Sequence, residues 1–382
     1  MNLHVALRFS ADNEIPVGIL SEVGQEIAFE FTPSFLTTPL PIAPFRLPTR
    51  HGITFYDRTK GGEIFGLFED SLPDGWGRRL QDDFFQRHIG RLPTIFERLA
   101  YVGTGGQGAL VYHPEVETDA MDKTIDLSTL AKSAMAFDAG DARDILPEVR
   151  RAGGSSGGAR PKASIGYNPQ TKEVCPDREE LPPGFEHWLV KFPNQQDPRN
   201  AGEIEWQYAK MAVAAGVEMS DFQLIQTSVG NFFATRRFDR TANGGRLHFA
   251  SAAGLLEVDF RIPGNEYRTL FRLTDALTRD YSAKKELFRR TTLNVLAHNR
   301  DDHLKNFGFL MDCNGTWRLA PFYDFTYSTG PNGWQTLSVA GEGRDPGPND
   351  LLRLANEVNL SSKDAQEIIT RVTDVIQSFN LL

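Results

Sequence analysis

The stretch His298-Asn-Arg-Asp-Asp-His-Leu-Lys-Asn306 decides how this chain is interpreted, together with Pro321-Phe-Tyr-Asp-Phe325 shortly after it. The two segments supply a carboxylate, an amide five residues later and a second carboxylate further along the chain. Phosphoryl transfer uses one carboxylate to accept the proton of the attacking hydroxyl, and an Asn with a second Asp to hold Mg²⁺. The order therefore predicts Asp301 as the base and Asn306 and Asp324 as the Mg²⁺ ligands.

The interval from Asp301 to Asn306 equals the Asp-to-Asn interval in the catalytic loop of protein kinases, which predicts an ATP-dependent kinase. Asp302 is the rival base, but it lies four residues from Asn306, so we assign it a local role. Lys305 would lie near the transferred phosphate and offset its developing charge. The alternative interpretation is a polar helix–loop junction with a surface lysine, because Asp, Asn and His often cap helices.

Lys191 is a second candidate, because it lies inside the apolar run Trp188-Leu-Val-Lys-Phe192. A lysine in a buried strand needs an anionic partner or a path to solvent. In a kinase it contacts the α- and β-phosphates and pairs with a glutamate on a helix. We predict Glu205 as that partner, with Glu203 second. The alternative is an edge-strand lysine whose ammonium group reaches water.

The glycine-rich segment 153–162 is the third candidate, because glycines let backbone N–H groups approach phosphate oxygens closely. Arg160 and Lys162 add positive charge there. The segment matches neither the Walker A pattern nor the G-x-G-x-x-G spacing of protein kinases, and a flexible linker is the alternative. Ser155 and Ser156 place two hydroxyls near the predicted phosphates. A second glycine-rich segment, 103–108, is interpreted as a turn between strands.

Composition excludes several classes of protein. The 382 residues are enough for two domains, or for one large domain with an added module. The net charge of -9 argues against non-specific nucleic-acid binding by the surface as a whole. Cys175 and Cys313 lack the spacing of a disulfide framework or a zinc site. The chain has no run of about 18 apolar residues and no basic, then apolar, leader, so we expect a cytoplasmic protein.

The hydrophobic pattern predicts strands first and helices later, which is typical of a two-lobed α/β fold. Alternation in residues 1–60 predicts short antiparallel strands. Further strands are expected at 109–112, 187–192 and 231–238. Helices are expected after the Pro-Asp-Gly turn at 73–75, near 127–138, over 201–217, and over 283–299 and 361–379. We predict a β-rich N-terminal module at 1–115, a kinase N-lobe at 116–240 and a helical C-lobe at 241–382.

Taken together, the motifs resemble the HipA family of bacterial Ser/Thr kinases, the toxins of HipBA-type toxin–antitoxin systems. The matching segments occur in the family's order and span most of the chain. They are Asp70-Ser-Leu-Pro-Asp-Gly-Trp-Gly-Arg78, Ser155-Ser-Gly-Gly-Ala-Arg-Pro-Lys162, Trp188-Leu-Val-Lys-Phe-Pro193, Arg237-Phe-Asp-Arg240, Asp301-Asp-His-Leu-Lys-Asn306 and Pro321-Phe-Tyr-Asp324.

The resemblance implies roles for further residues. It implies ATP and Mg²⁺ as cofactors, Asp301 as the catalytic base, Lys191 as the phosphate-contacting lysine and Ser155, or the adjacent Ser156, as a site of self-inactivating autophosphorylation. A phosphate there would repel the bound nucleotide phosphates. The implied nucleotide-binding residues are the glycine-rich loop Gly157, Gly158, Ala159, Arg160 and Lys162, the inter-lobe hinge Arg236, Arg237 and Phe238, and the bordering residues His303 and Tyr323.

The resemblance also implies partners. Family members pair with HipB, a small helix-turn-helix antitoxin that binds operator DNA, so contact with DNA would be indirect. They phosphorylate a serine of an aminoacyl-tRNA synthetase, notably glutamyl-tRNA synthetase, which stops translation and growth. This sequence departs from the family at Arg160-Pro161, where Pro161 removes one backbone donor. The alternatives are a small-molecule kinase of the aminoglycoside or sugar type and a nucleotide-binding pseudokinase that acts as a co-repressor.

Overall fold

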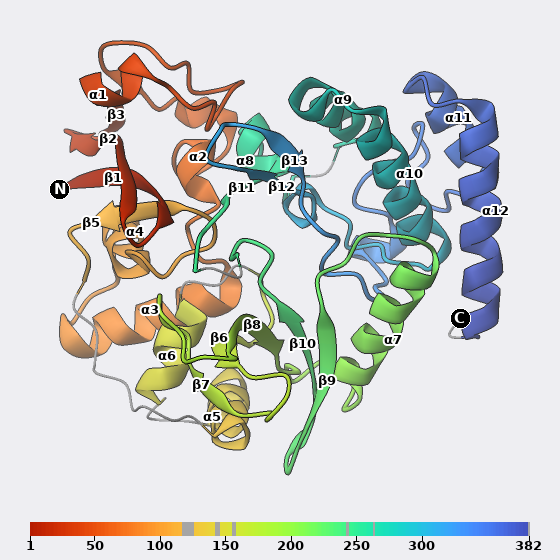
Figure 1. Cartoon of the computed structure of the whole chain (residues 1–382), viewed down its shortest axis with the longest axis horizontal. Coiled ribbons are helices and arrows are strands. Elements are labelled where there is room, and N and C mark those ends of the chain that lie inside the picture. The colour runs from red at the N-terminus through yellow and green to blue at the C-terminus, as the bar shows by residue number, and fades with distance from the viewer. Residues whose placement is uncertain (117–125, 142–145, 155–157, 242–243, 263, 381–382) are drawn as a thin grey trace.

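The computed structural model describes residues 1–116, 126–141, 146–154, 158–241, 244–262 and 264–380. These residues form three sheets, all antiparallel, and a group of helices that gathers at the C-terminal end of the molecule (Figure 1). The α/β class predicted from the sequence, β-rich at the N-terminus and mainly helical at the C-terminus, is confirmed. Within the described residues, no helix is long and apolar enough to cross a membrane.

The N-terminal sheet has the strand order β4-β3-β2-β1-β5 and confirms the short antiparallel strands predicted for residues 1–60. Alternate side chains of β1, including Leu3, Val5 and Leu7, are buried, as expected for a strand with one face on the core. β5 returns to pair with β1 only after an intervening helical segment. The bounds are β1 Asn2–Ser10, β2 Asn13–Val23, β3 Glu26–Phe31, α1 Pro33–Thr37, β4 Thr54–Phe55, η1 Arg58–Lys60, α2 Gly66–Glu69, α3 Gly75–His88, α4 Ile95–Val102 and β5 Leu110–His113.

The middle sheet has the order β7-β6-β8-β10-β9, which places β8 at its centre. Lys191 is the last residue of β8, so the alternative of an edge-strand lysine is wrong. The helices predicted near 127–138 and from 201 are present. The bounds are α5 Leu127–Ala139, α6 Pro147–Gly154, β6 Lys162–Tyr167, β7 Val174–Pro176, β8 Glu186–Lys191, α7 Ala201–Ala214, β9 Phe222–Thr227 and β10 Gly230–Arg236.

One prediction for this region is corrected. Gly153 and Gly154 were expected in the glycine-rich loop but end α6. A side chain on Gly153 would lie 2.7 Å from both Trp76 and Leu80 and 2.9 Å from the carbonyl oxygen of Lys162. Glycine is therefore required at this helix end for close packing against α3 and β6.

In the described part of the C-terminal region, a small sheet, β11-β12-β13, lies beside five α-helices and two short 3₁₀ helices. The helices predicted over 283–299 and 361–379 correspond to α10 and α12, and α12 packs on α10 at one end of the molecule (Figure 1). The bounds are β11 His248–Ser251, α8 Ala252–Leu256, α9 Tyr267–Thr278, α10 Tyr281–Leu296, η2 Leu304–Asn306, β12 Gly308–Met311, β13 Trp317–Leu319, η3 Pro331–Gly333, α11 Pro348–Glu357 and α12 Ser362–Phe379.

The hydrophobic core is divided in a way that sequence periodicity does not show. One cluster joins the N-terminal sheet to the C-terminal helices, from Leu3 to Val372. A second cluster belongs to the middle sheet with α5 and α6, and it takes Trp76 and Leu80 from α3. The N-terminal region is thus anchored on the helical region, while α3 reaches across to the middle sheet. The predicted boundaries at 115/116 and 240/241 stay predictions.

Candidate functional site

A cavity of about 590 Å³ lies between the middle sheet and the C-terminal region. The N-terminal region, the middle sheet and the C-terminal region all contribute residues to its wall, and most of the predicted site residues line it. These are Gly158, Ala159, Arg160, Lys162, Lys191, Glu205, Arg236, Arg237, Phe238, Asp301, His303, Lys305, Asn306, Tyr323 and Asp324. Gly157, Ser155 and Ser156 lie outside the described residues.

Lys191 is the centre of the charged cluster in this cavity. Its ammonium group forms ion pairs with Glu205 of α7 and with Asp324 of the C-terminal region. Glu203, the second candidate partner, instead accepts a hydrogen bond from Asn231, with 2.5 Å between Asn231 Nδ2 and Glu203 Oε1. Lys191 therefore bridges a helix of the middle sheet and the segment that carries the predicted metal-binding aspartate.

Two lysines share the charge of Asp324. Lys162 on β6 is the register partner of Lys191 on β8. Burial opposes ionisation of Asp324, but Lys191 and Lys162 outweigh it and hold the pKa of Asp324 below its ordinary value. Burial lowers the pKa of Lys162, and the neighbouring charge of Lys191 lowers it further. An anionic ligand in this cavity would meet two lysine side chains from neighbouring strands, and its own negative charge would favour the charged form of Lys162.

In the loop from Asp301 to Asn306, the amide of Asn306 and the carboxylate of Asp301 have different partners, although both residues line the cavity. Asn306 Nδ2 donates to the backbone carbonyl of Asp301 at 2.8 Å, so its Oδ1 atom is the one that can meet a metal. The Asp301 side chain is 62% exposed at the cavity mouth, and His303 Nε2 lies 3.8 Å from its Oδ1 atom. Asp324 has a left-handed backbone with φ 53°, which is uncommon for a residue other than glycine, and its carboxylate pairs with Lys191.

Asp302 has the local role assigned to it from the sequence. Its side chain is fully buried and points away from the cavity wall. It accepts hydrogen bonds from the Tyr267 hydroxyl, from Gln335 Nε2 at 2.8 Å, and from the backbone N–H groups of Thr336 at 3.0 Å and Leu337 at 3.2 Å. The carboxylate thus ties the loop to the segment around residue 336.

This burial predicts a pH dependence of stability. Burial raises the pKa of Asp302 to about 6, against about 3.9 in an unfolded chain, so the folded state holds this proton more tightly. The contribution of Asp302 to stability is complete below pH 4 and is lost as the pH rises through 6. Between pH 4 and pH 7 the wild type is expected to lose up to about 3 kcal/mol relative to Asp302→Asn, which does not titrate. Urea unfolding of both proteins at several pH values measures this difference; parallel pH profiles would contradict it.

The glycine-rich loop is docked against the N-terminus of α3. Gly158 has φ 89°, a left-handed conformation that glycine adopts without strain. Its N–H group donates to Asp74 Oδ2 at 3.2 Å, and its carbonyl oxygen accepts from the N–H of Trp76 at 3.3 Å. Arg160 turns outward to an ion pair with Asp197 at 2.8 Å. Asp74 also lines the cavity, although the sequence analysis assigned it no role and noted it only within a Pro-Asp-Gly turn and within the family-matching segment from Asp70 to Arg78.

Two backbone N–H groups of the predicted hinge already donate hydrogen bonds to other parts of the chain. The N–H of Arg236 donates to the Asp221 carbonyl and that of Arg237 to the His187 carbonyl, each at 2.8 Å. Phe238 stacks near Tyr323, with 5.5 Å between ring centroids. His303 lies elsewhere, against Phe260 at 4.7 Å. The aromatic wall at the hinge is therefore made by Phe238 and Tyr323, while His303 belongs to the loop from Asp301 to Asn306 and packs against Phe260.

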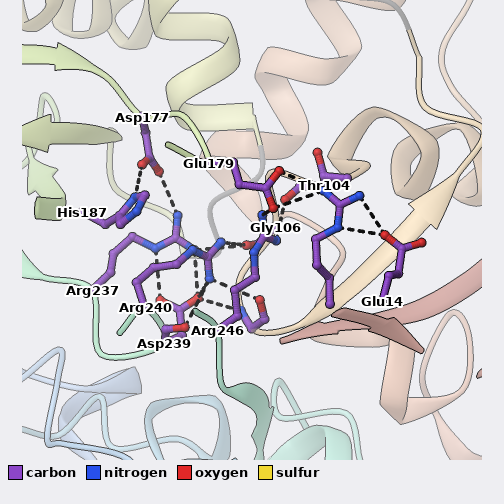
Figure 2. A network of polar contacts seen from close by, with 12 residues as sticks. Glu14, Thr104, Gly106, Asp177, Glu179, His187, Arg237, Asp239, Arg240 and Arg246 are labelled. Carbon is purple, nitrogen blue, oxygen red and sulfur yellow. Dashed lines mark hydrogen bonds and ion pairs between the residues drawn. The ribbon is translucent and has the colours of Figure 1, made fainter. Parts of the chain in front are cut away.

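A buried network behind the hinge was missed by the sequence analysis (Figure 2). Asp239 accepts from Arg237 Nη2 at 2.8 Å, from Arg240 Nη1 at 2.6 Å and from the N–H of Gly108 at 2.7 Å. Arg237 and Arg240 also donate to the Gly106 carbonyl, at 3.0 and 2.8 Å, and Arg246 donates to the Thr104 carbonyl at 2.7 Å. The segment 103–108, interpreted as a turn between strands, instead connects helix α4 to strand β5, and three arginines hold it to the hinge and to the residues that follow the hinge.

Two family models and a solved structure match this chain. A family model described as the HipA-like C-terminal domain matches residues 154–379, and the HipA N-terminal domain model matches residues 11–113. A chain of the Shewanella oneidensis MR-1 toxin–antitoxin complex of HipA, HipB and operator DNA shares the fold. It aligns with 99% of this chain and 89% of its own length at 17% identity, with a TM-score of 0.72. The Helicobacter pylori proinflammatory kinase CtkA gives a TM-score of 0.38 at 14% identity, over 56% of this chain and 90% of its own, which is too weak to support an inference.

Proposed function

This chain belongs to the HipA family, and we propose that it is an ATP-dependent Ser/Thr protein kinase acting as the toxin of a toxin–antitoxin system. The observation that carries the proposal is the ion-paired set Glu205–Lys191–Asp324 facing Asp301 and Asn306 across one cavity. A lysine paired with a helical glutamate, next to an acid–amide–acid set, is the arrangement that phosphoryl transfer from ATP requires.

The nucleotide would lie with its base near the hinge and its phosphates near the lysines. Phe238 and Tyr323 offer the base an aromatic wall. Lys191 and Lys162 would meet the phosphate oxygens, and the backbone around Gly158 would cover them. The side-chain oxygens of Asn306 and Asp324 are hard donors that suit Mg²⁺, which would neutralise charge on the β- and γ-phosphates.

In the transfer step, the hydroxyl oxygen of a protein serine or threonine forms a bond to the γ-phosphorus as the bond to the β–γ bridging oxygen breaks. The proton of that hydroxyl passes to the carboxylate of Asp301. Lys305, whose side chain is 13% exposed in the cavity wall, is placed to offset charge on the transferring group. Positioning and charge compensation supply most of the rate in such reactions.

The proposal extends to partners. The Shewanella structure with the same fold contains HipB and operator DNA, which supports a HipB-like antitoxin here, with DNA contacted through it. From the family resemblance we propose an aminoacyl-tRNA synthetase, such as glutamyl-tRNA synthetase, as substrate. Autophosphorylation at Ser155 or Ser156, directly before the loop that covers the phosphates, would switch the kinase off by charge repulsion.

Removing the Lys191 ammonium group tests nucleotide binding. Lys191→Met is expected to raise the Kd for Mg·ATP by about 10- to 100-fold, because a charge-assisted contact is worth about 1.5–3 kcal/mol. Calorimetric titration measures the change. Lys363→Met, at a lysine whose side chain is 86% exposed on α12, is the matched control and should bind as wild type. Equal affinity of Lys191→Met and wild type would remove Lys191 from the nucleotide site.

A further inference from the structure

We propose that Asp74, from the N-terminal region, is a positioning residue for phosphoryl transfer, holding Lys305 and the glycine-rich loop at the place where the transferred phosphate would lie. The inference rests on the proposed kinase function and deepens it. Asp74 contacts neither base nor metal ligand in this account, so it would act through Lys305 and Gly158.

The contact with Lys305 is the first support. Both carboxylate oxygens of Asp74 lie 3.1 Å from Lys305 Nζ, which is also 5.2 Å from the centre of the Phe260 ring. The two side chains are only 16% and 13% exposed, so the pair is shielded from water. Burial opposes ionisation of Asp74, but Lys305 more than compensates and lowers its pKa. The carboxylate is therefore charged at neutral pH and fixes the ammonium group of a long, flexible side chain.

The contact with Gly158 is the second support. Asp74 Oδ2 accepts from the Gly158 N–H at 3.2 Å, and the Trp76 N–H donates to the carbonyl of that same glycine at 3.3 Å. A side chain added at Gly75 would lie 3.3 Å from the Ala159 Cα atom, so helix and loop are in close contact. The start of α3 thus holds the peptide groups on both sides of Gly158.

These contacts make one carboxylate the link between two parts of the site. Lys305 belongs to the C-terminal region and Gly158 to the loop before the middle sheet, and both line the same cavity. Asp74 can serve both because α3 shares the core of the middle sheet while the rest of the N-terminal region packs on the C-terminal helices. The Asp74 side chain, at the start of α3, consequently sets the distance from Lys305 to the glycine-rich loop.

The reaction is sensitive to this distance. A misplacement of about 1 Å at a reacting group lowers the rate by up to about 100-fold. Nucleotide binding, in contrast, would be provided mainly by Lys191, Lys162 and the hinge, and an asparagine at position 74 can still accept the hydrogen bond from the Gly158 N–H that holds the loop. Loss of the Asp74 charge should therefore lower kcat and leave the KM for ATP nearly unchanged.

The test is a double-mutant cycle of Asp74→Asn and Lys305→Met, measured as kcat and as KM for ATP. Asp74→Asn keeps the size of the side chain and is expected to lower kcat by about 10- to 100-fold, with KM changing less than about threefold. In the Lys305→Met background the same substitution should have little further effect, because the asparagine oxygen can still accept from the Gly158 N–H and the contact that is weakened is the one to Lys305. Glu367→Gln, at a glutamate whose side chain is 64% exposed on α12, is the control for loss of one negative charge.

The outcomes distinguish a failure of the proposed kinase function from a failure of the proposed role of Asp74. A wild-type protein that transfers no phosphate contradicts the proposed function itself. If the wild type transfers and Asp74→Asn matches it, or if the two substitutions are multiplicative in kcat, Asp74 does not act through Lys305 and the inference is overturned. A thermal melt of each variant identifies any loss of activity through unfolding. A fall in kcat for a protein that melts like wild type, absent in the Lys305→Met background, supports the inference.

Discussion

Replacing Asp301 with asparagine is expected to lower the rate of phosphoryl transfer by about 10²- to 10⁴-fold, the usual contribution of a positioned general base. An amide has the shape of the carboxylate but cannot accept the proton of the attacking hydroxyl. Partial burial raises the pKa of Asp301 above its ordinary value; the nearby His303 opposes this shift and the charge of Asp324 adds to it, and a raised pKa makes the carboxylate a stronger base. Because Asn306 contacts the backbone carbonyl of Asp301, the loop should keep its shape in the variant.

Nucleotide affinity separates a chemical from a structural effect of this substitution. Asp301→Asn should bind Mg·ATP with a Kd within about threefold of wild type, because other residues make the binding contacts. A threefold change in Kd corresponds to less than about 1 kcal/mol of binding free energy. Asp345→Asn, at an aspartate whose side chain is 88% exposed, is the matched control and should transfer at the wild-type rate. Full transfer by Asp301→Asn would remove Asp301 from the role of base.

The largest expected effect on stability comes from Asp239→Ala. The Asp239 side chain is 3% exposed and lies between two arginines of the hinge network, Arg237 and Arg240 (Figure 2). Even with Asp239 in place, burial and the charge of Arg237 lower the pKa of Arg240 to about 9. Removing the carboxylate takes away the acid that pairs with Arg240, leaves Arg237 with Asp177 as its acidic partner, and leaves the Gly108 N–H without its acceptor. We expect a loss of about 3–5 kcal/mol in the free energy of unfolding.

Urea unfolding of Asp239→Ala measures this loss. The control is Asp221→Ala, which removes an ion pair with Arg236 at 3.3 Å whose aspartate side chain is 68% exposed. An exposed pair of this kind contributes about 1 kcal/mol or less, so the two alanine variants should differ by several kcal/mol. If both variants lose the same small amount, the network does not hold segment 103–108 to the hinge.

Local sequence patterns predicted the elements and the pairing of Lys191. Apolar alternation indicated β1 and β3, helical spacing indicated α7, and a lysine inside an apolar strand required a carboxylate nearby. Glu205 was favoured on the next helix, and the structure pairs it with Lys191. These features depend on residues close together in the sequence, where spacing constrains geometry.

The remaining features depend on residues far apart in the chain. Asp239 and Gly108 are separated by 131 positions, and Lys305 and Asp74 by 231, so no spacing rule could bring them together. Glycine at 153 and 154 favoured a loop, but tight packing against Trp76 keeps Gly153 in a helix, so tertiary contact overrode local propensity. A buried acid beside two arginines, as in Arg237-Phe-Asp-Arg240, was the one local signal of the hinge network.

The most direct test of the central claim is incubation of the wild type and of Asp301→Asn with γ-labelled ATP, Mg²⁺ and a cell lysate. The account predicts label in a protein with the wild type and none with the variant. A band of synthetase size identifies the substrate class, and label in the chain's own band should map to the peptide with Ser155 and Ser156. Label found only in small molecules, or none at all from a protein that binds ATP, would contradict a protein kinase and favour a small-molecule kinase or a pseudokinase.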